Sequence, residues 1–346
     1  MNLVQPLRAL RSYVLARGCA SLSLRRTGLV AYATFAITAS AADTQQTLSV
    51  ADYRTYLEAS HPVPQALQHL SDSFNTSNSG NWQLQVIRNP VGGTPLQQIQ
   101  AVQQGAAGAP QIMLAAATGL AELASSFALF DQPYAIANAE QAEQFYASAQ
   151  ADAMLQQLQQ HGLHGLAWME NGFRIVTAER PLTQMEDLQG LRIRTVPNAL
   201  STQLFAALGA TPVSMPAHQV PNALKNGEIQ AQESFITLAL QQGASALQPH
   251  LWLTQHSYGA QVLVMNLQAW QALSAQEQQR LEAAARQAAI QQRQNARQAD
   301  QQALQRMTEM GMQLHQPSAQ LQRTFEDATR HLRTIPLAAP QPPPPL

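Results

Sequence analysis

The sequence predicts an α/β fold of two domains, and three observations support this prediction. Strand and helix patterns alternate between Gly172 and Ser234, and they alternate again through residues 46–169. A stretch without glycine or proline runs from Ser274 to Met310, which is long enough for a helix that crosses two domains. A chain of 346 residues also suits two domains with a core in each.

Residues 1–42 have the three parts of a secretory signal peptide. Arg25 and Arg26 precede an apolar run at residues 29–39, and the small residues 39–42 form a cleavage pattern. The apolar run is too short to span a bilayer as a stable helix. We therefore expect export to the periplasm, by the Sec route or, because of the paired arginines, by the twin-arginine route. Cys19 is the only cysteine and falls in this leader, so the mature chain has no disulfide and no cysteine nucleophile.

The charge of the mature chain excludes nucleic acid as a partner. Five arginines and no acidic residue lie in residues 1–42, which leaves 15 basic side chains against 21 acidic ones and a net charge near −6. Nucleic-acid binding needs a basic stripe that such a surface does not provide. An anionic ligand must therefore be captured locally, by a few arginines in a cleft.

The first half of the mature chain alternates strands with helices. Apolar and alternating runs predict strands at residues 46–51, 82–87, 111–116 and 163–169. Helical periodicity predicts helices at residues 64–74, 95–105 and 138–160. Thr94 and Pro95 provide the cap and first turn of the second of these helices.

The second half contains a βαβαβ unit. Its strands are predicted at residues 191–196, 211–215 and 228–234, and two helices that end at Gly209 and Gly227 join them. Such a unit implies a parallel sheet, and ligands of parallel sheets bind beyond the carboxyl ends of the strands. Arg194 lies near such an end, where its planar guanidinium suits a carboxylate. The alternative is an ordinary strand arginine paired with an acid on the surface.

A long helix and a proline-rich tail complete the chain. Ser274 and Glu277 form a capping box, and Gly311 provides the stop. The apolar positions of the helix do not keep a strict heptad, so a helix across two domains fits better than a coiled coil. Residues 336–346 are rich in proline and are expected to be disordered.

Several segments of the chain resemble one protein family. They read Gly-Phe-Arg, Asp-Leu-Gln-Gly-Leu-Arg-Ile-Arg, Leu-Gly-Ala-Thr-Pro, Ala-Leu-Lys-Asn-Gly and Gln-Glu at residues 172–174, 187–194, 208–212, 223–227 and 232–233. Their order and spacing resemble the periplasmic solute-binding subunits of tripartite ATP-independent (TRAP) transporters, of the dicarboxylate-binding DctP type. The resemblance covers roughly residues 48–335.

The resemblance implies a two-lobed periplasmic binding protein with a ligand cleft between the lobes and a long helix that spans both. Lobe I would comprise residues 48–171 and 260–299, and lobe II residues 172–259 and 300–335. Crossing segments at residues 169–172 and 258–261 would act as hinges.

The resemblance also implies ligand contacts. Arg194 matches the position at which the family pairs with the carboxylate of its ligand, and Arg174 matches an arginine that reaches the ligand from the hinge side. A hinge ion pair is the alternative for Arg174. Asn198 is a helix N-cap that can also face an anion.

Three further candidates complete the predicted site. By the same resemblance, Gln232, Glu233 and Ser234 stand where the family usually has Gln-Glu-Asn, so a hydroxyl replaces an amide at the third position, Ser234. Thr118 follows the apolar run Ala115 to Ala117 and is the polar candidate on the first domain's wall.

The predicted function is capture of a small organic acid and its delivery to the small and large TRAP membrane subunits. Enzyme motifs such as His-Glu-x-x-His, Gly-x-Ser-x-Gly and a phosphate-binding loop are absent from the sequence, so we expect no enzyme activity, metal or cofactor. We also expect a monomer. The alternatives are an exported hydrolase-like α/β enzyme for an anionic substrate and a solute sensor.

Overall fold

A computed structural model describes residues 45–77 and 80–337 of the chain. The predicted signal peptide and residues 338–346 of the predicted tail lie outside the described residues. In the part that is described, no helix combines the length and the apolar character needed to cross a membrane.

The strands form one continuous mixed sheet in the order β2-β1-β3-β9-β4-β7-β5-β6, with β8 and β10 added beside β4. Strands β1, β2 and β3 pair in parallel at one end, and β5, β6 and β7 pair in parallel at the other. Antiparallel β9 and β4 join the two ends. The strands are β1 Gln46–Asp52, β2 Trp82–Val86, β3 Ile112–Ala116, β4 Leu163–Ala178, β5 Arg192–Thr195, β6 Thr211–Ser214, β7 Ala231–Phe235, β8 His250–Trp252, β9 Tyr258–Asn266 and β10 Gln313–His315.

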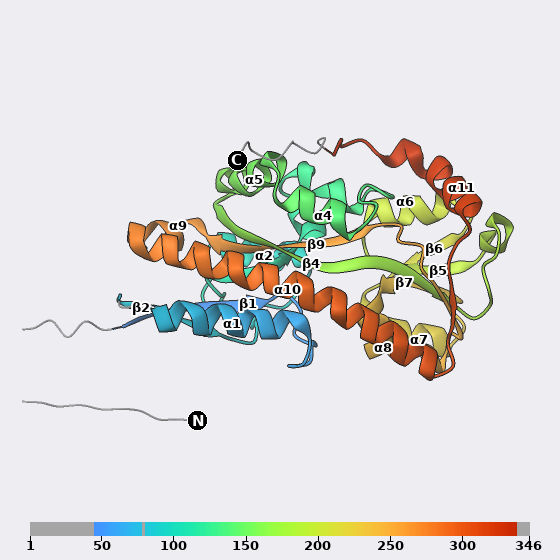
Figure 1. The fold of residues 1–346 in the computed structure, drawn as a ribbon, viewed down its shortest axis with the longest axis horizontal. Helices are drawn as coiled ribbons and strands as arrows, with labels where there is room; N and C mark the ends of the chain where they lie inside the picture. Colours follow the sequence, from blue (N-terminus) through green and yellow to red (C-terminus); the bar gives the residue numbers. More distant parts are fainter. Residues whose placement is uncertain (1–44, 78–79, 338–346) are drawn as a thin grey trace, which may run out of the picture. The chain divides into compact units, whose positions relative to one another are not determined.

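Helices cover both ends of this sheet (Figure 1). The α-helices are α1 Pro62–Ser77, α2 Pro95–Gln103, α3 Ala117–Leu120, α4 Ala139–Tyr146, α5 Ala149–Gln157, α6 Ala199–Ala207, α7 Val220–Lys225, α8 Ile236–Gln241, α9 Leu267–Gln271, α10 Ala275–Glu309 and α11 Ala319–Thr329. Short 3₁₀ turns are η1 Ser125–Asp131, η2 Leu158–His161, η3 Met185–Leu188, η4 Ala217–Gln219, η5 Ala244–Ala246 and η6 Arg330–Leu332. The predicted βαβαβ unit is confirmed as β5-α6-β6-α7-β7, with all three strands parallel.

Separate hydrophobic cores form at the two ends of the sheet. Leu48, Leu114 and Leu281 belong to one core beside β1 and β3, and Trp168 belongs to a second core on the other side. Ile193, Phe205 and Phe325 belong to a distinct core around β5 and α6. Separate cores at the two ends of one sheet are the physical basis of a two-lobed fold, because each lobe buries its own apolar faces. The residue boundaries of the lobes stay a prediction.

The helix predicted at residues 138–160 is wrong in its extent. The segment contains two helices, α4 and α5, with a break at Ala147 and Ser148, and it ends in the 3₁₀ turn η2. Ser148 causes the break, since its hydroxyl accepts a hydrogen bond from the N–H of Ala151 (3.2 Å) and starts a new helix.

The strand predicted to end at Met169 is also wrong in its extent. Strand β4 continues for 16 residues, to Ala178, and passes from one end of the sheet to the other. A bulge between Glu170 and Gly172 bends it, and Gly172 takes a left-handed backbone conformation with φ +79°. The chain therefore bends within the pairing with β9 and stays a strand.

Helix α10 confirms the predicted long helix. Its capping box of Ser274 and Glu277 is formed, and the helix packs against α1, β4 and α8. Figure 1 shows it running along the sheet from α1 to α8. It thus touches both ends of the fold, which favours a spanning helix over a coiled coil.

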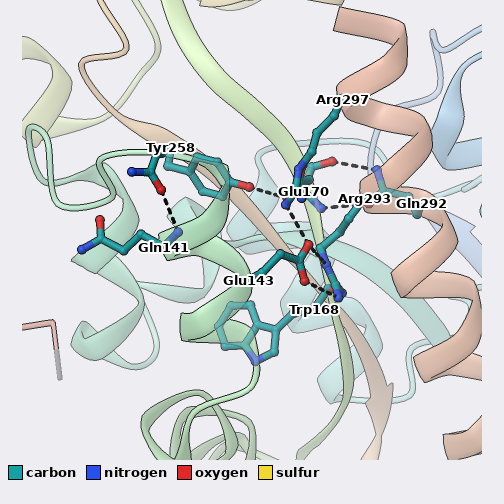
Figure 2. A network of polar contacts seen from close by, with 9 residues as sticks. Gln141, Glu143, Trp168, Glu170, Tyr258, Gln292, Arg293 and Arg297 are labelled. Atoms are coloured by element: carbon teal, nitrogen blue, oxygen red, sulfur yellow. Dashed lines mark hydrogen bonds and ion pairs between the residues drawn. The ribbon is translucent and has the colours of Figure 1, made fainter. Parts of the chain in front are cut away.

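A polar network fastens α10 to the bend in β4 (Figure 2). The side-chain amide of Gln292 donates to the carbonyl oxygen of Glu170 (2.7 Å) and accepts from its N–H (3.0 Å). Arg297 donates to both carboxylate oxygens of Glu170, each at 2.8 Å, and Tyr258 donates to the same carboxylate. Arg293 links the helix to Glu143 and to the carbonyl oxygen of Trp168. The network holds the middle of the helix to the strand that joins the two lobes.

Candidate functional site

A cavity of about 620 Å³ lies between the two ends of the sheet. Residues from the β1 and β3 end line one side of it, and residues from β5, β7 and α8 line the other. Its wall contains three arginines and several aromatic side chains. They are Arg54, Arg174 and Arg194, with Tyr53, Tyr56, Phe130, Phe235 and Tyr258.

A second hollow of about 640 Å³ is lined by residues of α5, α10 and β4. Its arginines are less suited to a ligand. Arg286 is largely exposed, and Arg293 is already bonded to Glu143 and to the backbone of Trp168. The cavity of about 620 Å³ is therefore the better candidate site.

Arg194 stands on β5, next to the carboxyl end of the strand, and is only 2 % exposed. Its Nε donates to the carbonyl oxygen of Met215 (2.9 Å), and its Nη1 donates to that of Glu233 (3.0 Å). Burial lowers the pKa of Arg194 to about 10, while the charge of Glu233 raises it, so the group stays charged at neutral pH. Within the described residues its second amino group has no hydrogen-bond partner.

Arg174 lies on β4 beside β7. Its Nε donates to the carboxylate of Glu233, and its guanidinium lies over the ring of Phe235, 4.2 Å from the centroid. The two arginines thus share one carboxylate, because Nη1 of Arg194 also lies 3.7 Å from an oxygen of Glu233. The ion pair that was the alternative for Arg174 is present, and Arg174 also lines the cavity.

Glu233 is fully buried on β7. Its carboxylate accepts the N–H of Val196 (2.6 Å) in addition to the bond from Arg174. Burial by itself would raise the pKa of Glu233, but Arg174, His256 and Arg194 outweigh it and hold the pKa well below its usual range. Glu233 therefore keeps its charge and orients both arginines.

Asp131 joins two of the predicted residues to each other. One of its carboxylate oxygens accepts the hydroxyl of Thr118 (3.1 Å), and the other accepts the amide of Asn198 (3.2 Å). Burial raises the pKa of Asp131 to about 6 against the opposing effect of these bonds. Thr118 and Asp131 follow β3, whereas Asn198 caps α6, so this bridge connects the two sides of the cavity.

The segment after β1 supplies the other wall. Nε and Nη2 of Arg54 donate to Asp52 (3.1 and 2.8 Å), and its Nη1 donates to Asn171 (2.8 Å). Burial raises the pKa of Tyr56, and the charges of Arg54, Arg194 and Arg174 act against that shift. Tyr56 lines the same cavity as Arg174 and Arg194 of the opposite side.

The structure separates the predicted site residues into two groups. Arg194, Arg174 and Thr118 line the cavity. Glu233, Ser234 and Asn198 are not among the described residues that line it. Ser234 is fully buried, and its hydroxyl has no hydrogen-bond partner within the described part of the chain.

Asp131, Arg54 and Tyr56 line the cavity but were not predicted from the sequence. Tyr53, Arg54 and Tyr56 follow directly after the buried parallel strand β1, and charged and aromatic residues in such a place are a sign of a ligand site. Asp131 had no such signal, because it ends a short 3₁₀ turn. In the described residues, no group of three or more His, Cys, Asp or Glu side chains is placed to hold a metal ion.

Comparison with known proteins agrees with this geometry. The model of the family "bacterial extracellular solute-binding protein, family 7" (DctP) matches residues 53–334. The chain belongs to this family. It is 28 % identical to the 2,3-diketo-L-gulonate-binding periplasmic protein YiaO of Escherichia coli over 288 residues. These residues make up 82 % of this chain and 87 % of that protein. It is also 28 % identical to the C4-dicarboxylate-binding periplasmic protein DctP of Rhodobacter capsulatus, over 58 % of this chain and 61 % of that protein.

Solved structures of TRAP periplasmic solute-binding proteins share the fold. A TRAP periplasmic solute-binding protein from Ochrobactrum anthropi superposes with a TM-score of 0.77 at 26 % identity, over 84 % of this chain and 89 % of that chain. A TRAP periplasmic solute-binding protein from Citrobacter koseri with bound D-glucuronate superposes with a TM-score of 0.74 at 23 % identity, over 83 % of this chain and 94 % of that chain. The predicted two-lobed fold and the TRAP solute-binding family are both confirmed. The relatives described here are binding proteins, not enzymes.

Proposed function

We propose that this chain is the periplasmic solute-binding subunit of a TRAP transporter and that it captures a small organic acid between its lobes. The observation that carries the proposal is the cluster of Arg174, Arg194 and Glu233 at the cavity. Two guanidiniums that share one buried carboxylate leave one positive charge in excess, which a ligand carboxylate neutralises. Charge-assisted bonds of this kind are strong where water is excluded.

Five of the six predicted residues have a role in this proposal. Arg194 and Arg174 contact the ligand carboxylate, and Glu233 positions both guanidiniums from behind. Thr118 and Asn198 act through Asp131, which they hold in place across the cavity. Ser234 receives no role from its position.

Delivery follows from closure. Contacts from both lobes exist together only when the cleft is shut, so the ligand selects the closed state. The membrane subunits of the transporter then distinguish loaded protein from empty protein. We propose that the exported chain acts as a monomer and leaves its ligand chemically unchanged.

Calorimetry with acids bound by the relatives tests the proposal. D-glucuronate, 2,3-diketo-L-gulonate and succinate are titrated into the mature chain and into Arg194→Lys. A lysine cannot reproduce the two parallel hydrogen bonds of the planar guanidinium, so binding should weaken by about 2–5 kcal/mol of binding free energy.

Arg192→Lys is the matched control for this experiment. Arg192 stands two residues away on the same strand, is exposed, and donates to the backbone carbonyl oxygens of Glu228 and Gly227. This variant should bind like the wild type. Equal affinity for wild type and Arg194→Lys would contradict the proposal.

A further inference from the structure

We infer that the cavity selects monocarboxylates and that Asp131 is the residue that rejects a second carboxylate. This inference rests on the proposed function, because it assumes that a ligand carboxylate meets Arg174 and Arg194. It adds the class of acid and a specificity-determining residue.

The arginine cluster can neutralise one carboxylate. Arg174 and Arg194 contribute two positive charges, and Glu233 cancels one of them from its fully buried position. Glu233 is held ionised by its bonds to Arg174 and to the N–H of Val196. One uncompensated positive charge remains for the ligand.

The other buried cationic groups of the wall are not available for a second carboxylate. All three nitrogens of the Arg54 guanidinium donate to Asp52 or Asn171, so Asp52 already cancels its charge. His61 accepts the N–H of Val63 at Nδ1 (3.2 Å), and burial lowers its pKa to about 3, so the ring is neutral. His218 and Glu122 also line the cavity, and both are exposed to solvent.

Asp131 adds a negative charge to the wall of the cavity. It lines the cavity, and both of its oxygens are held by donors, the hydroxyl of Thr118 and the amide of Asn198. Donors of this kind stabilise the ionised form of a carboxylate. A neutral or hydroxylated ligand body can lie beside this group, whereas a second ligand carboxylate is repelled by it and finds no free cation.

Two pairs of acids that differ only in the number of carboxylates test the inference. Gluconate is compared with glucarate, and benzoate with terephthalate, by calorimetry on the mature chain at pH 8 and at one fixed salt concentration. We expect the monoacid of a bound pair to bind about tenfold or more tightly than its diacid. The first carboxylate of the diacid meets the arginines, whereas the second is repelled by Asp131 and has no free cation to pair with. The wild-type ratio is measurable without any variant.

Two variants locate the effect. Asp131→Asn keeps the shape of the side chain and removes its charge, so the ratio of diacid to monoacid affinity should rise about tenfold. Glu179→Gln removes an exposed acid that does not line the cavity and should leave the ratio unchanged.

The outcomes separate this inference from the proposed function. If diacids bind as tightly as monoacids and Arg194→Lys loses affinity for both, the monocarboxylate selectivity is overturned. The proposed function, capture of an organic acid, is then still supported. A monoacid preference that persists unchanged in Asp131→Asn overturns the role of Asp131. If neither acid of either pair binds, and a neutral sugar binds with equal affinity to wild type and Arg194→Lys, both proposals fail.

Discussion

Arg174 donates a hydrogen bond from Nε to the fully buried carboxylate of Glu233, and this pair sets the charge of the site. The bond leaves the guanidinium of Arg174 over Phe235, on the wall of the cavity. Since Nη1 of Arg194 also lies 3.7 Å from Glu233, one carboxylate orients both arginines. An empty cavity thus keeps two neighbouring cations in place, because Glu233 reduces their mutual repulsion.

Glu233→Gln is therefore expected to destabilise the empty protein. Removal of one partner of a buried ion pair leaves uncompensated charge, and the free energy of unfolding should fall by about 3–5 kcal/mol. A bound acid restores a negative charge between the arginines, so saturating ligand should recover more stability in this variant than in the wild type. Urea denaturation followed by circular dichroism, with and without ligand, measures both effects.

The exposed Glu179 provides the control for that experiment. The free energy of unfolding of Glu179→Gln should lie within about 0.5 kcal/mol of the wild-type value, as is usual for surface substitutions. A Glu233→Gln protein as stable as this control would show that Glu233 does not organise the arginines.

Asn198→Ala is expected to weaken ligand binding as well as helix α6. Asn198 caps α6, since its side chain accepts the N–H of Ser201 (3.0 Å), and its amide also donates to Asp131 across the cavity. Loss of the cap should cost about 1 kcal/mol of stability. Loss of the bond to Asp131 removes one contact between the two sides, so ligand affinity should fall about fivefold.

Ser318→Ala separates the two effects of that substitution. Ser318 caps α11 in the same way, by accepting the N–H of Leu321 (3.1 Å), and it does not line the cavity. The midpoint temperature of thermal unfolding should fall by a similar amount in both variants, whereas calorimetry should find weaker ligand binding only in Asn198→Ala. Equal binding by both would leave Asn198 as a cap alone.

The sequence predicted the βαβαβ unit well because its signals are local. Apolar alternation, the turn at Gly209 and the helix stop at Gly227 fall within a few residues of the strands they delimit. The position of Arg194 followed from the rule that places ligands at the carboxyl ends of parallel strands.

The continuity of β4 and the role of Asp131 could not be predicted in this way. Glu170, Asn171 and Gly172 look like a turn, but the strand continues there in its pairing with β9, and Gln292, 122 residues away, bonds to the backbone of Glu170. Asp131 meets Asn198 across 67 residues of sequence. Contacts between separate lobes depend on how complete elements pack, and no local pattern encodes them.

Asp300→Asn is expected to remove a slope in the dependence of stability on pH. Burial raises the pKa of Asp300 to about 8, and the nearby charge of Glu170 adds to this effect. The folded protein then binds more protons than the unfolded chain between about pH 4 and pH 8, so the free energy of unfolding falls as pH rises through that window. An amide keeps an acceptor for the N–H of Thr237 and does not titrate.

Denaturant unfolding at a series of pH values from 5 to 9 measures this difference. Asp300→Asn should be more stable than the wild type at pH 9, and the difference should shrink toward pH 5. Asp152→Asn, which changes an exposed acid, should follow the wild-type curve. Parallel curves for wild type and Asp300→Asn would refute the raised pKa.

Gly172→Ala is expected to disturb the bend of β4, where the two lobes are joined. The residue has φ +79°, and an added Cβ would lie 2.5 Å from a carboxylate oxygen of Asp300 on α10. The backbone strain of a non-glycine residue in this conformation costs about 1–3 kcal/mol, and displacement of Asp300 adds to it. Gly190→Ala isolates the strain, because Gly190 has φ +67° and no atom within 4 Å of an added Cβ. Unfolding midpoints in urea should rank wild type, Gly190→Ala and Gly172→Ala in falling order, and equal midpoints for the two variants would mean that contact with α10 does not constrain the bend.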